Sequence, residues 1–326
     1  MPGSDGPRYV DRWRSNGSLV PFTGSGVRSF VFVFEGKAEC LTDLCHRYLS
    51  APTGGQVEYR PVTSLVALIF SRVQKLVASN PPYSGMGWFA ETEAAFWVLT
   101  TAVQHQDDGS AFADHLAWFV PYIFTDSPLA ISEGREIFGF PKEFGWFEMP
   151  ANDDVDRLTV DVHAVRRFNS TDAEGRRERL LEVHRAPDGP VSGVRRRLEA
   201  FAEVGRLLKD LWGDSRKLLT PDLNFVSTFL DDVIHHRGQI VCLKQVYDSA
   251  DTSRACYQAI VEIPLKATQF RAGAVLPDAY LLTLNKLDSH PIQTDLGLED
   301  GERSLLGYSI DFDFEFEPGE TIWKWG

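Results

Sequence analysis

The strongest pattern in the chain is the alternation of apolar and polar side chains with a period of two. Residues 310–316 read IDFDFEF, so Ile310 and three phenylalanines share one side while acidic residues occupy the other. A strand with this pattern buries one face and leaves the other in water. Such half-buried strands predict an antiparallel sheet or barrel rather than a doubly wound parallel sheet. Similar strand-like runs occupy residues 28–34, 158–165, 239–246 and 257–265.

Helical periodicity is confined to fewer segments. Residues 39–49 carry apolar side chains near helical spacing, and residues 193–212 do so at regular steps of three and four. Thr220 and Pro221 suit the N-cap and first turn of a helix over residues 219–236. We therefore predict a single domain over residues 1–326, with a helical excursion from a β scaffold at about 188–237.

The composition is that of a globular protein. The chain has 326 residues, of which 43% are hydrophobic, and its formal net charge is −13. This apolar content can offset the entropy of ordering, so disorder is not expected. The net acidity repels phosphate and argues against a nucleic-acid partner. The sequence contains no run of about 18 apolar residues that would predict a membrane span, and residues 1–16 lack the apolar core of a signal peptide. We therefore expect a cytoplasmic protein without a membrane partner.

Common catalytic and metal-binding motifs are missing from the sequence. It contains no P-loop, GxGxxG, HExxH or GxSxG motif. Cys40 and Cys45 lack the CxxC spacing of a zinc site. His235 and His236 are adjacent, so on a helix their rings would point about 100° apart. We therefore predict no metal site.

One lysine lies in an unusual setting. Residues 134–145 read GREIFGFPKEFG, which places Lys142 between phenylalanines and directly after Pro141. The proline stiffens the segment and pushes Phe140 toward an extended conformation. Burial disfavours a charged lysine, so we expect the pKa of Lys142 to be lowered. A neutral lysine can attack a ketone and form a Schiff base. The alternative is a strand-end lysine whose ammonium lies in solvent.

The sequence GREIFGFPK resembles the active-site signature of acetoacetate decarboxylase. In that family the lysine directly after the proline forms the Schiff base, and it is an established example of an activated lysine. This puts the nucleophile at Lys142. Residues 28–45, RSFVFVFEGKAECLTDLC, resemble the family's arginine-led strand and the helix that follows it. The resemblance therefore puts an active-site arginine at Arg28, holding the site's carboxylate or the substrate anion.

A further segment extends the resemblance. Residues 85–91, GMGWFAE, resemble the family's glycine–x–glycine segment that ends in the active-site glutamate. This puts the carboxylate at Glu91, and Glu93 is the alternative if the register differs by two residues. The resemblance covers roughly residues 20–165 and is weaker in the last third of the chain. It implies an α+β, mainly β fold, with a large antiparallel β-barrel-like domain and peripheral helices.

The resemblance also implies how the site works. A small-molecule keto acid or ketone would react with Lys142, without a metal or an organic cofactor, in a subunit of a homo-oligomer. Arg135 is either a structural partner within the signature or the residue that meets a substrate carboxylate, because the guanidinium can donate two parallel hydrogen bonds. Trp88, Phe89 and Phe140 would form apolar walls that lower the local dielectric constant.

Two departures from the family's pattern leave the reaction open. A second lysine follows the Schiff-base lysine in the family and lowers its pKa, but Glu143 stands here. A nearby carboxylate would raise the lysine pKa, so either Lys142 depends on desolvation or Glu143 points away. A second acidic position of the family falls near Ile69 and is lost. The first hypothesis is a β-keto acid decarboxylase. The others are a Schiff-base aldolase, dehydratase or cyclase acting on a 2-oxo acid or larger ketone, and a non-catalytic small-molecule binding protein.

Overall fold

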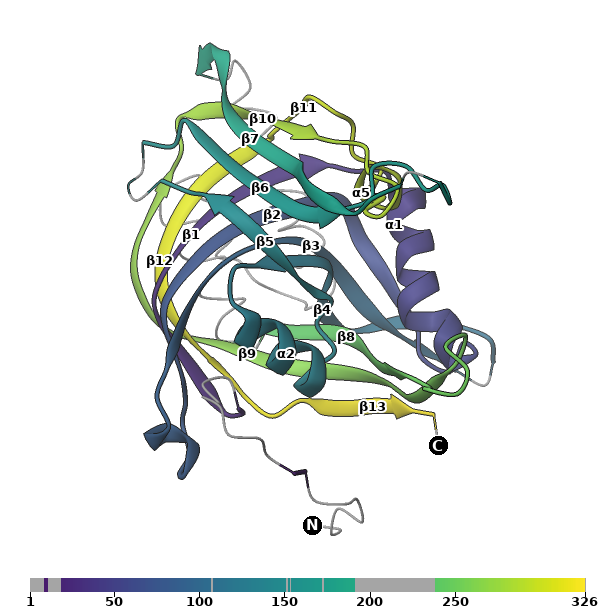
Figure 1. Ribbon diagram of the computed structural model, residues 1–326. Coiled ribbons are helices and arrows are strands. Elements are labelled where there is room, and N and C mark those ends of the chain that lie inside the picture. The colour runs from purple at the N-terminus through teal and green to yellow at the C-terminus, as the bar shows by residue number, and fades with distance from the viewer. Residues whose placement is uncertain are drawn as a thin grey trace.

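A computed structural model describes residues 9–10, 19–106, 108–150, 152, 154–171, 173–190 and 238–325. Within these residues, seven strands of one large sheet close into a hydrogen-bonded ring, in the order β4-β3-β2-β1-β12-β9-β8 and back to β4 (Figure 1). The ring strands are β1 Phe22–Glu35, β2 Tyr59–Ala78, β3 Phe89–His105, β4 Ala111–Thr125, β8 Gly238–Tyr247, β9 Ala255–Val275 and β12 Leu306–Phe316.

The sheet continues beyond the ring and folds over its outside (Figure 1). It runs from β4 through β5, β6, β7 and β10 to β11, while β13 pairs with β9. Neighbouring strands are antiparallel, except that β4 pairs in parallel with β5 and with β8. The bounds of these strands are β5 Lys142–Glu148, β6 Arg157–Ala164, β7 Arg176–Pro190, β10 Asp278–Leu284, β11 Glu302–Arg303 and β13 Glu320–Lys324.

Short helices pack against the sheet. α1 spans Ala38–Cys45 and continues as a π-helical turn over His46–Ser50 and a 3-10 turn over Ala51–Thr53. α2 spans Pro128–Ile137, a 3-10 turn covers Tyr83–Gly85, and α5 spans Ile292–Leu296. The hydroxyl of Ser127 accepts a hydrogen bond from the amide of Ala130, so a side-chain N-cap and a first-turn proline begin α2. Each helix in the described part of the chain is too short or too polar to cross a bilayer.

The two faces of the ring strands pack differently. On the outer face, Phe30, Phe32 and Phe70 are fully buried against side chains of β6, β7 and β10. On the inner face, a second cluster joins ring residues such as Phe22 and Phe314 to side chains of α2 and of the segment after it. Alternation along each strand sends successive side chains to opposite faces, so each ring strand contributes to both clusters.

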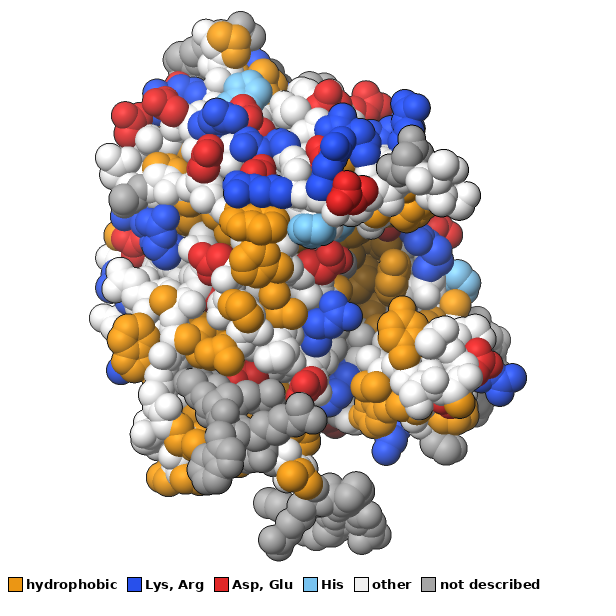
Figure 2. All heavy atoms as spheres, viewed as in Figure 1, with side chains coloured by type: hydrophobic (Ala, Val, Ile, Leu, Met, Phe, Trp, Pro, Cys, Tyr) orange, Lys and Arg blue, Asp and Glu red, His pale blue; other side chains and the backbone are white. Residues whose placement is uncertain are grey.

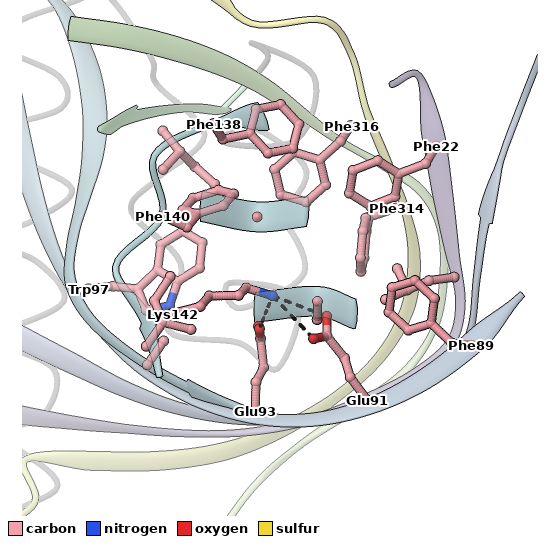
Figure 3. A pocket seen from close by; sticks show the side chains of 16 residues that line it. Phe22, Phe89, Glu91, Glu93, Trp97, Phe138, Phe140, Lys142, Phe314 and Phe316 are labelled. Atoms are coloured by element: carbon pink, nitrogen blue, oxygen red, sulfur yellow. Dashed lines mark hydrogen bonds and ion pairs between the residues drawn. The ribbon is translucent and has the colours of Figure 1, made fainter. Parts of the chain in front are cut away.

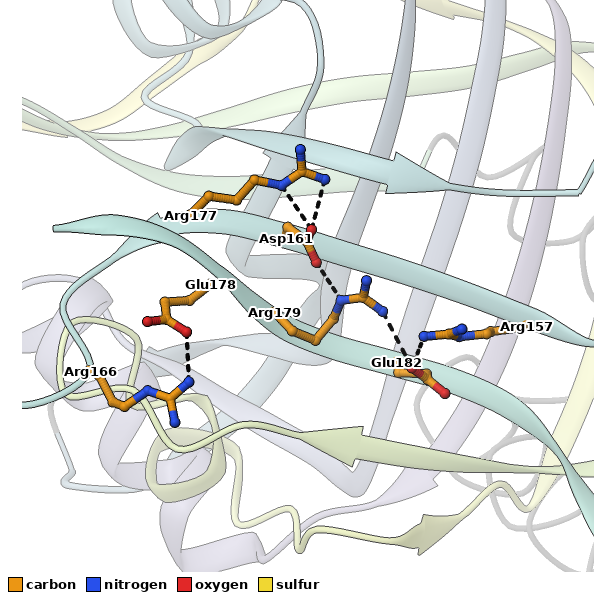
Figure 4. Close-up of polar contacts among 7 residues, drawn as sticks. All are labelled: Arg157, Asp161, Arg166, Arg177, Glu178, Arg179 and Glu182. Atoms are coloured by element: carbon orange, nitrogen blue, oxygen red, sulfur yellow. Dashed lines mark hydrogen bonds and ion pairs between the residues drawn. The ribbon is translucent and has the colours of Figure 1, made fainter.

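Charged side chains cover the outer layer (Figures 2 and 4). On β6 and β7, Asp161 accepts hydrogen bonds from Arg177 and Arg179, and Arg179 also contacts Glu182 at 3.3 Å. Arg157 reaches Glu182 from the neighbouring strand at 2.6 Å. Partly exposed pairs of this kind each contribute about 0–1 kcal/mol, so this network marks a solvated face.

The predicted strands agree with the observed ones. Residues 28–34, 239–246, 257–265 and 310–316 lie within β1, β8, β9 and β12, and residues 158–165 overlap β6 up to Ala164. The helix predicted over residues 39–49 corresponds to α1 and the π-helical turn. Of the helical excursion predicted at 188–237, residues 188–190 belong to β7 and the rest lies outside the described residues. α2 was not predicted.

Candidate active site

Lys142 begins β5 and points into a cavity at the inner face of the ring (Figure 3). The cavity has a volume of about 60 Å³, and Lys142 is 8% exposed. Its charged lining residues are Lys142, Glu91 and Glu93. Aromatic and aliphatic side chains form most of the remaining wall, among them Phe89, Phe138, Phe140, Ile240, Phe314 and Phe316. The ammonium is therefore held in a small and mostly apolar space.

The segment between α2 and β5 fixes the lysine stem. A Cβ atom added at Gly134 would lie 3.1 Å from Cδ of Lys142, so the glycine leaves room for the stem along α2. Gly139 has φ +83°, and a Cβ atom there would lie 2.4 Å from Cα of Lys244. A side chain is excluded at this turn both by the left-handed backbone and by the contact. The glycines of the sequence GREIFGFPK thus shape the approach to Lys142.

Two carboxylates of β3 flank the ammonium. Nζ of Lys142 lies 3.1 Å from Oε2 and 3.4 Å from Oε1 of Glu91, and 3.2 Å from Oε2 of Glu93. The hydroxyl of Thr125 donates to Glu91 Oε2 at 3.1 Å. Glu91 and Glu93 are two residues apart on one strand, so both face the cavity (Figure 3). The two alternatives of the sequence analysis are therefore both beside the lysine.

The electrostatics of this cluster differ from the sequence-based expectation. Burial disfavours the ammonium, but the negative charges of Glu91 and Glu93 outweigh it and raise the pKa of Lys142. Burial also raises the pKa of Glu91, which the charge of Lys142 only partly offsets. The lowered lysine pKa predicted from the sequence is therefore wrong. The apolar neighbours of Lys142 in sequence gave no sign of the carboxylates that β3 brings from another part of the chain.

Glu143 points away from the cavity. Its side chain is 48% exposed, and its Oε2 lies 3.1 Å from Nε2 of His290. Adjacent residues of a strand face opposite sides, so the inward position of Lys142 sends Glu143 outward. Of the two possibilities left by the sequence, Glu143 pointing away is the one observed, and this residue does not contact the lysine head.

Arg28 is not brought to the Lys142 cavity. Phe22 and Gly24 of β1 approach the inner face, so strict alternation would send Arg28 inward as well. However, the register of β1 against β12 shifts between Gly24 and Val27, so Val27 lines the ring interior and Arg28 faces the other side. There the guanidinium lies 3.7 Å from Asp311. The placement expected for Arg28 in the site is therefore corrected.

The expected substrate-binding residues divide into two groups. Phe89 and Phe140 line the cavity. Trp88 lies just before β3, in which Phe89 and every second residue after it face the cavity, so Trp88 points outward and is 56% exposed. Its expected place in the wall is therefore also corrected. Arg135 lies on α2, and its Nη1 donates to the backbone carbonyl of Lys142 at 3.2 Å. Arg135 thus braces the start of β5 and is not among the lining residues.

A second cavity adjoins the first within the ring. It has a volume of about 210 Å³, and both cavities are lined by Glu93, Trp97, Phe314 and Phe316. Neither this cavity nor the place of the C-terminal phenylalanines in its wall was predicted from the sequence. Their alternation in residues 310–316 was the available signal. Among the residues that the structure describes, no group of three or more His, Cys, Asp or Glu side chains is arranged to hold a metal ion.

Comparisons with known proteins identify the fold. No protein-family model matches the chain, and no curated protein matches its sequence. Among solved structures, acetoacetate decarboxylase from Legionella pneumophila subsp. pneumophila str. Philadelphia 1 matches with a TM-score of 0.54 and 14% identity, covering 100% of this chain and 93% of that one. An acetoacetate decarboxylase-like enzyme from Sphingomonas wittichii RW1 matches with a TM-score of 0.51 and 10% identity, covering 93% of each chain.

A third structure has a different printed description. The enduracididine biosynthesis enzyme MppR, complexed with the condensation product of pyruvate and imidazole 4-carboxaldehyde, matches with a TM-score of 0.50 and 10% identity. The match covers 98% of each chain. The chain thus has the fold of acetoacetate decarboxylase and similar enzymes, in a divergent form, and the fold implied by the sequence resemblance is confirmed.

Proposed function

We propose that this protein is a lyase in which Lys142 forms a Schiff base with a carbonyl substrate, and that its reaction is the decarboxylation of a β-keto acid. The observation that carries the proposal is the position of the Lys142 ammonium, buried in a mostly apolar cavity between Glu91 and Glu93. A lysine that served only as a surface charge would not need two carboxylates and an aromatic enclosure. The shared fold with acetoacetate decarboxylase adds support.

The first step is activation of the lysine. Nζ is protonated at rest, so it must lose a proton before it can attack a carbonyl carbon. Glu91 is the acceptor, because its Oε2 lies 3.1 Å away and burial has raised its pKa. The free amine then forms a C–N bond with the carbonyl carbon. The carbonyl oxygen takes one proton from the attacking nitrogen and one from Glu91, and leaves as water, which produces a positively charged iminium.

The iminium accepts the electron pair of the bond that breaks. When the carbon–carbon bond to the carboxylate breaks, carbon dioxide leaves and the electrons form a neutral enamine. A proton taken up from solvent is then delivered to the enamine carbon through Glu93, whose carboxylate lies 3.2 Å from Nζ, and water hydrolyses the iminium and returns the lysine. Once Glu91 has given up its proton to the departing oxygen, its negative charge also favours this direction, because it repels the substrate carboxylate and has no such interaction with neutral carbon dioxide.

A Schiff-base aldolase or dehydratase is the second candidate. The specific observation in its favour is that Glu91 and Glu93 both contact Nζ, so one carboxylate can accept the lysine proton while the other removes a proton next to the iminium. The resulting enamine would attack an aldehyde instead of a proton. The similarity to MppR, whose structure holds a condensation product of pyruvate with an aldehyde, also favours this candidate.

Borohydride trapping tests the Schiff base. The protein is incubated with acetoacetate or pyruvate and reduced, and mass spectrometry of the intact protein and its peptides locates any adduct. We expect one adduct, on Lys142, and none in a Lys142→Arg variant. Lys244 is the matched internal control, because it is also partly buried, its pKa is lowered by burial, and its Nζ donates to the Ile137 carbonyl at 3.0 Å.

Two results would contradict the proposal. An adduct on Lys244 with none on Lys142 would show that a reactive lysine is present but is not the one proposed. No adduct with any keto acid would favour a non-catalytic binding protein. If Lys142 is trapped, release of carbon dioxide from a β-keto acid, compared with condensation of pyruvate with an aldehyde, distinguishes the two candidate reactions.

A further inference from the structure

We propose that the substrate of Lys142 is a β-keto acid with a long alkyl tail, and that the tail lies in the larger cavity inside the ring. This inference rests on the proposed Schiff-base function and adds the class of substrate. The family resemblance leaves the size of the keto acid or ketone open, whereas the space beside Lys142 in this chain suits a larger molecule.

Continuity of the two cavities is the first argument. Trp97, Phe314 and Phe316 line both the 60 Å³ cavity that holds Nζ and the 210 Å³ cavity beside it. Glu93, whose carboxylate lies 3.2 Å from Nζ, also belongs to both. A β-keto acid whose carbonyl carbon is bonded to Nζ therefore has room to extend its alkyl substituent past Glu93 and Trp97 into the larger space.

The chemistry of the larger cavity is the second argument. Its walls are mainly aliphatic and aromatic, including Val27, Val31, Ala67, Ile69, Leu265 and Ile310. The hydroxyls of Ser29 and Ser71 lie 2.8 Å apart and are hydrogen-bonded to each other. Among the described lining residues, Glu93 is the only one with a carboxylate, and none is a lysine or arginine. As far as the described lining shows, the cavity beyond Glu93 offers contacts for methylene groups rather than a charged partner for a polar tail.

Size is the third argument. An apolar cavity of about 150 Å³ is large enough to hold benzene in another protein, and this cavity is larger at about 210 Å³. Each methylene group moved from water into such a space strengthens binding by about fourfold. Affinity should therefore rise steeply with tail length until the cavity is full.

Binding of straight-chain 2-alkanones tests the inference without requiring turnover. These ketones are the decarboxylation products of 3-oxoalkanoates, and they carry the same tail. We expect affinity, measured by calorimetry and by quenching of tryptophan fluorescence, to increase roughly tenfold or more for each pair of added methylenes from 2-butanone onward, and then to level off. Trp97 and Trp118 line the larger cavity and serve as reporters.

A pair of matched variants locates the tail. Ala67→Phe places a ring in the larger cavity, and Ala113→Phe makes the same change at an exposed position of β4. We expect Ala67→Phe to weaken 2-decanone binding at least 100-fold while 2-butanone binding and borohydride trapping of acetone on Lys142 persist. Ala113→Phe should alter none of them. Trapping of acetone on Lys142 in Ala67→Phe also shows that the variant is folded.

The outcomes separate the inference from the function on which it rests. Suppose that Lys142 is trapped, but that affinity does not depend on chain length or that Ala67→Phe binds 2-decanone like the unaltered protein. The proposal of an alkyl tail in the larger cavity is then wrong, and the proposal of a Schiff base on Lys142 is unaffected. If chain-length dependence is found but no ketone or keto acid is trapped on Lys142, the proposed function is contradicted. The ring would then be an alkyl-binding cavity, and the inference that its ligand is a substrate of Lys142 would fail with the function.

Discussion

The two faces of the same ring strands have different packing. On the outer face of β1 and β2, Phe30, Phe32 and Phe70 are fully buried against the second layer of the sheet. On the inner face of the same strands, Val31 and Ile69 border a cavity of about 210 Å³. Residues one position apart therefore have different roles, because dense packing on the outer face stabilises the fold while the unfilled inner face leaves room for a ligand.

Charged groups differ between the faces in the same way. Outside, Asp161 and Glu182 pair with arginines at a solvated surface. Inside, Glu91 and Glu93 share one buried lysine, and the pKa of Glu91 is raised by burial. Buried ion pairs are poor evidence of stability but are often found where proton transfer is needed. Mutations on the two faces should therefore affect different properties.

The largest expected effect is that of Lys142→Arg. Arginine keeps a positive charge between the two carboxylates, so the variant should fold, but a guanidinium cannot serve as the amine nucleophile. We expect the rate of carbon dioxide release from a 3-oxoalkanoate to fall by about 10⁴-fold or more. Lys244→Arg is the matched control and should retain activity. A Lys142→Arg rate within tenfold of the unaltered protein would rule out the covalent mechanism.

Truncation of the packed face should give the next largest effect. Phe32→Ala removes a fully buried ring from the outer core and should lower the free energy of unfolding by about 3–5 kcal/mol. Ile69→Ala, one strand away on the hollow face, should cost less, because its side chain already borders empty space. Urea unfolding of both variants measures the difference. Equal losses would mean that the inner face is packed as tightly as the outer one.

Glu91→Gln should have a smaller effect on rate. Removing the proton acceptor of Lys142 should lower turnover by about 100-fold. In the unaltered protein, activity should fall on the acidic side as Glu91 is protonated, and because its pKa is raised this fall begins at a higher pH than for an ordinary glutamate. The pH profile of the variant should lose this dependence. If the acidic fall persists in Glu91→Gln and disappears in Glu93→Gln, the two roles are exchanged.

The smallest effect should come from an outer ion pair. His115 Nε2 lies 2.6 Å from Glu262, and this hydrogen bond, partly opposed by burial, raises the pKa of His115 to about 9. The pair should stabilise the fold fully below about pH 6.5, the unfolded-state value, and lose this contribution as pH rises toward 9. Because the histidine is partly exposed, His115→Gln should remove only about 1 kcal/mol, measured by thermal unfolding. Ketone binding should not change.

Local sequence patterns predicted the strands and the position of the lysine well, but they did not predict the contacts between segments that are distant in the sequence. Alternation placed Ile310 and Phe314 on one face, because this pattern depends only on neighbouring residues. The same alternation in β3 could have placed Glu91 and Glu93 together instead of as alternatives. Ser127 and Pro128 form a start signal for α2, which was not predicted. The Lys142 segment was recognised because its glycines, proline and lysine are contiguous in the chain.

The position of Arg28 could not be read from alternation alone. Gly26 adopts φ +65°, and the register of β1 shifts beside it, which reverses the faces of the residues that follow. Whether a strand carries such an irregularity depends on its partners, here β12, which lies far away in the sequence. The raised pKa of Lys142 has a similar origin, since it depends on carboxylates that the fold brings close and that no local pattern around the lysine reveals.

Because Glu143 points away from the cavity, a substitution at this one position has little access to the Lys142 ammonium. A Glu143→Lys substitution would give the chain the two consecutive lysines of the resembled family. The new ammonium would nevertheless lie beside His290, on the side of the strand that faces away from the cavity. A charge change that is meant to shift the pKa of Lys142 is therefore better made on β3, where residues 91 and 93 contact Nζ directly.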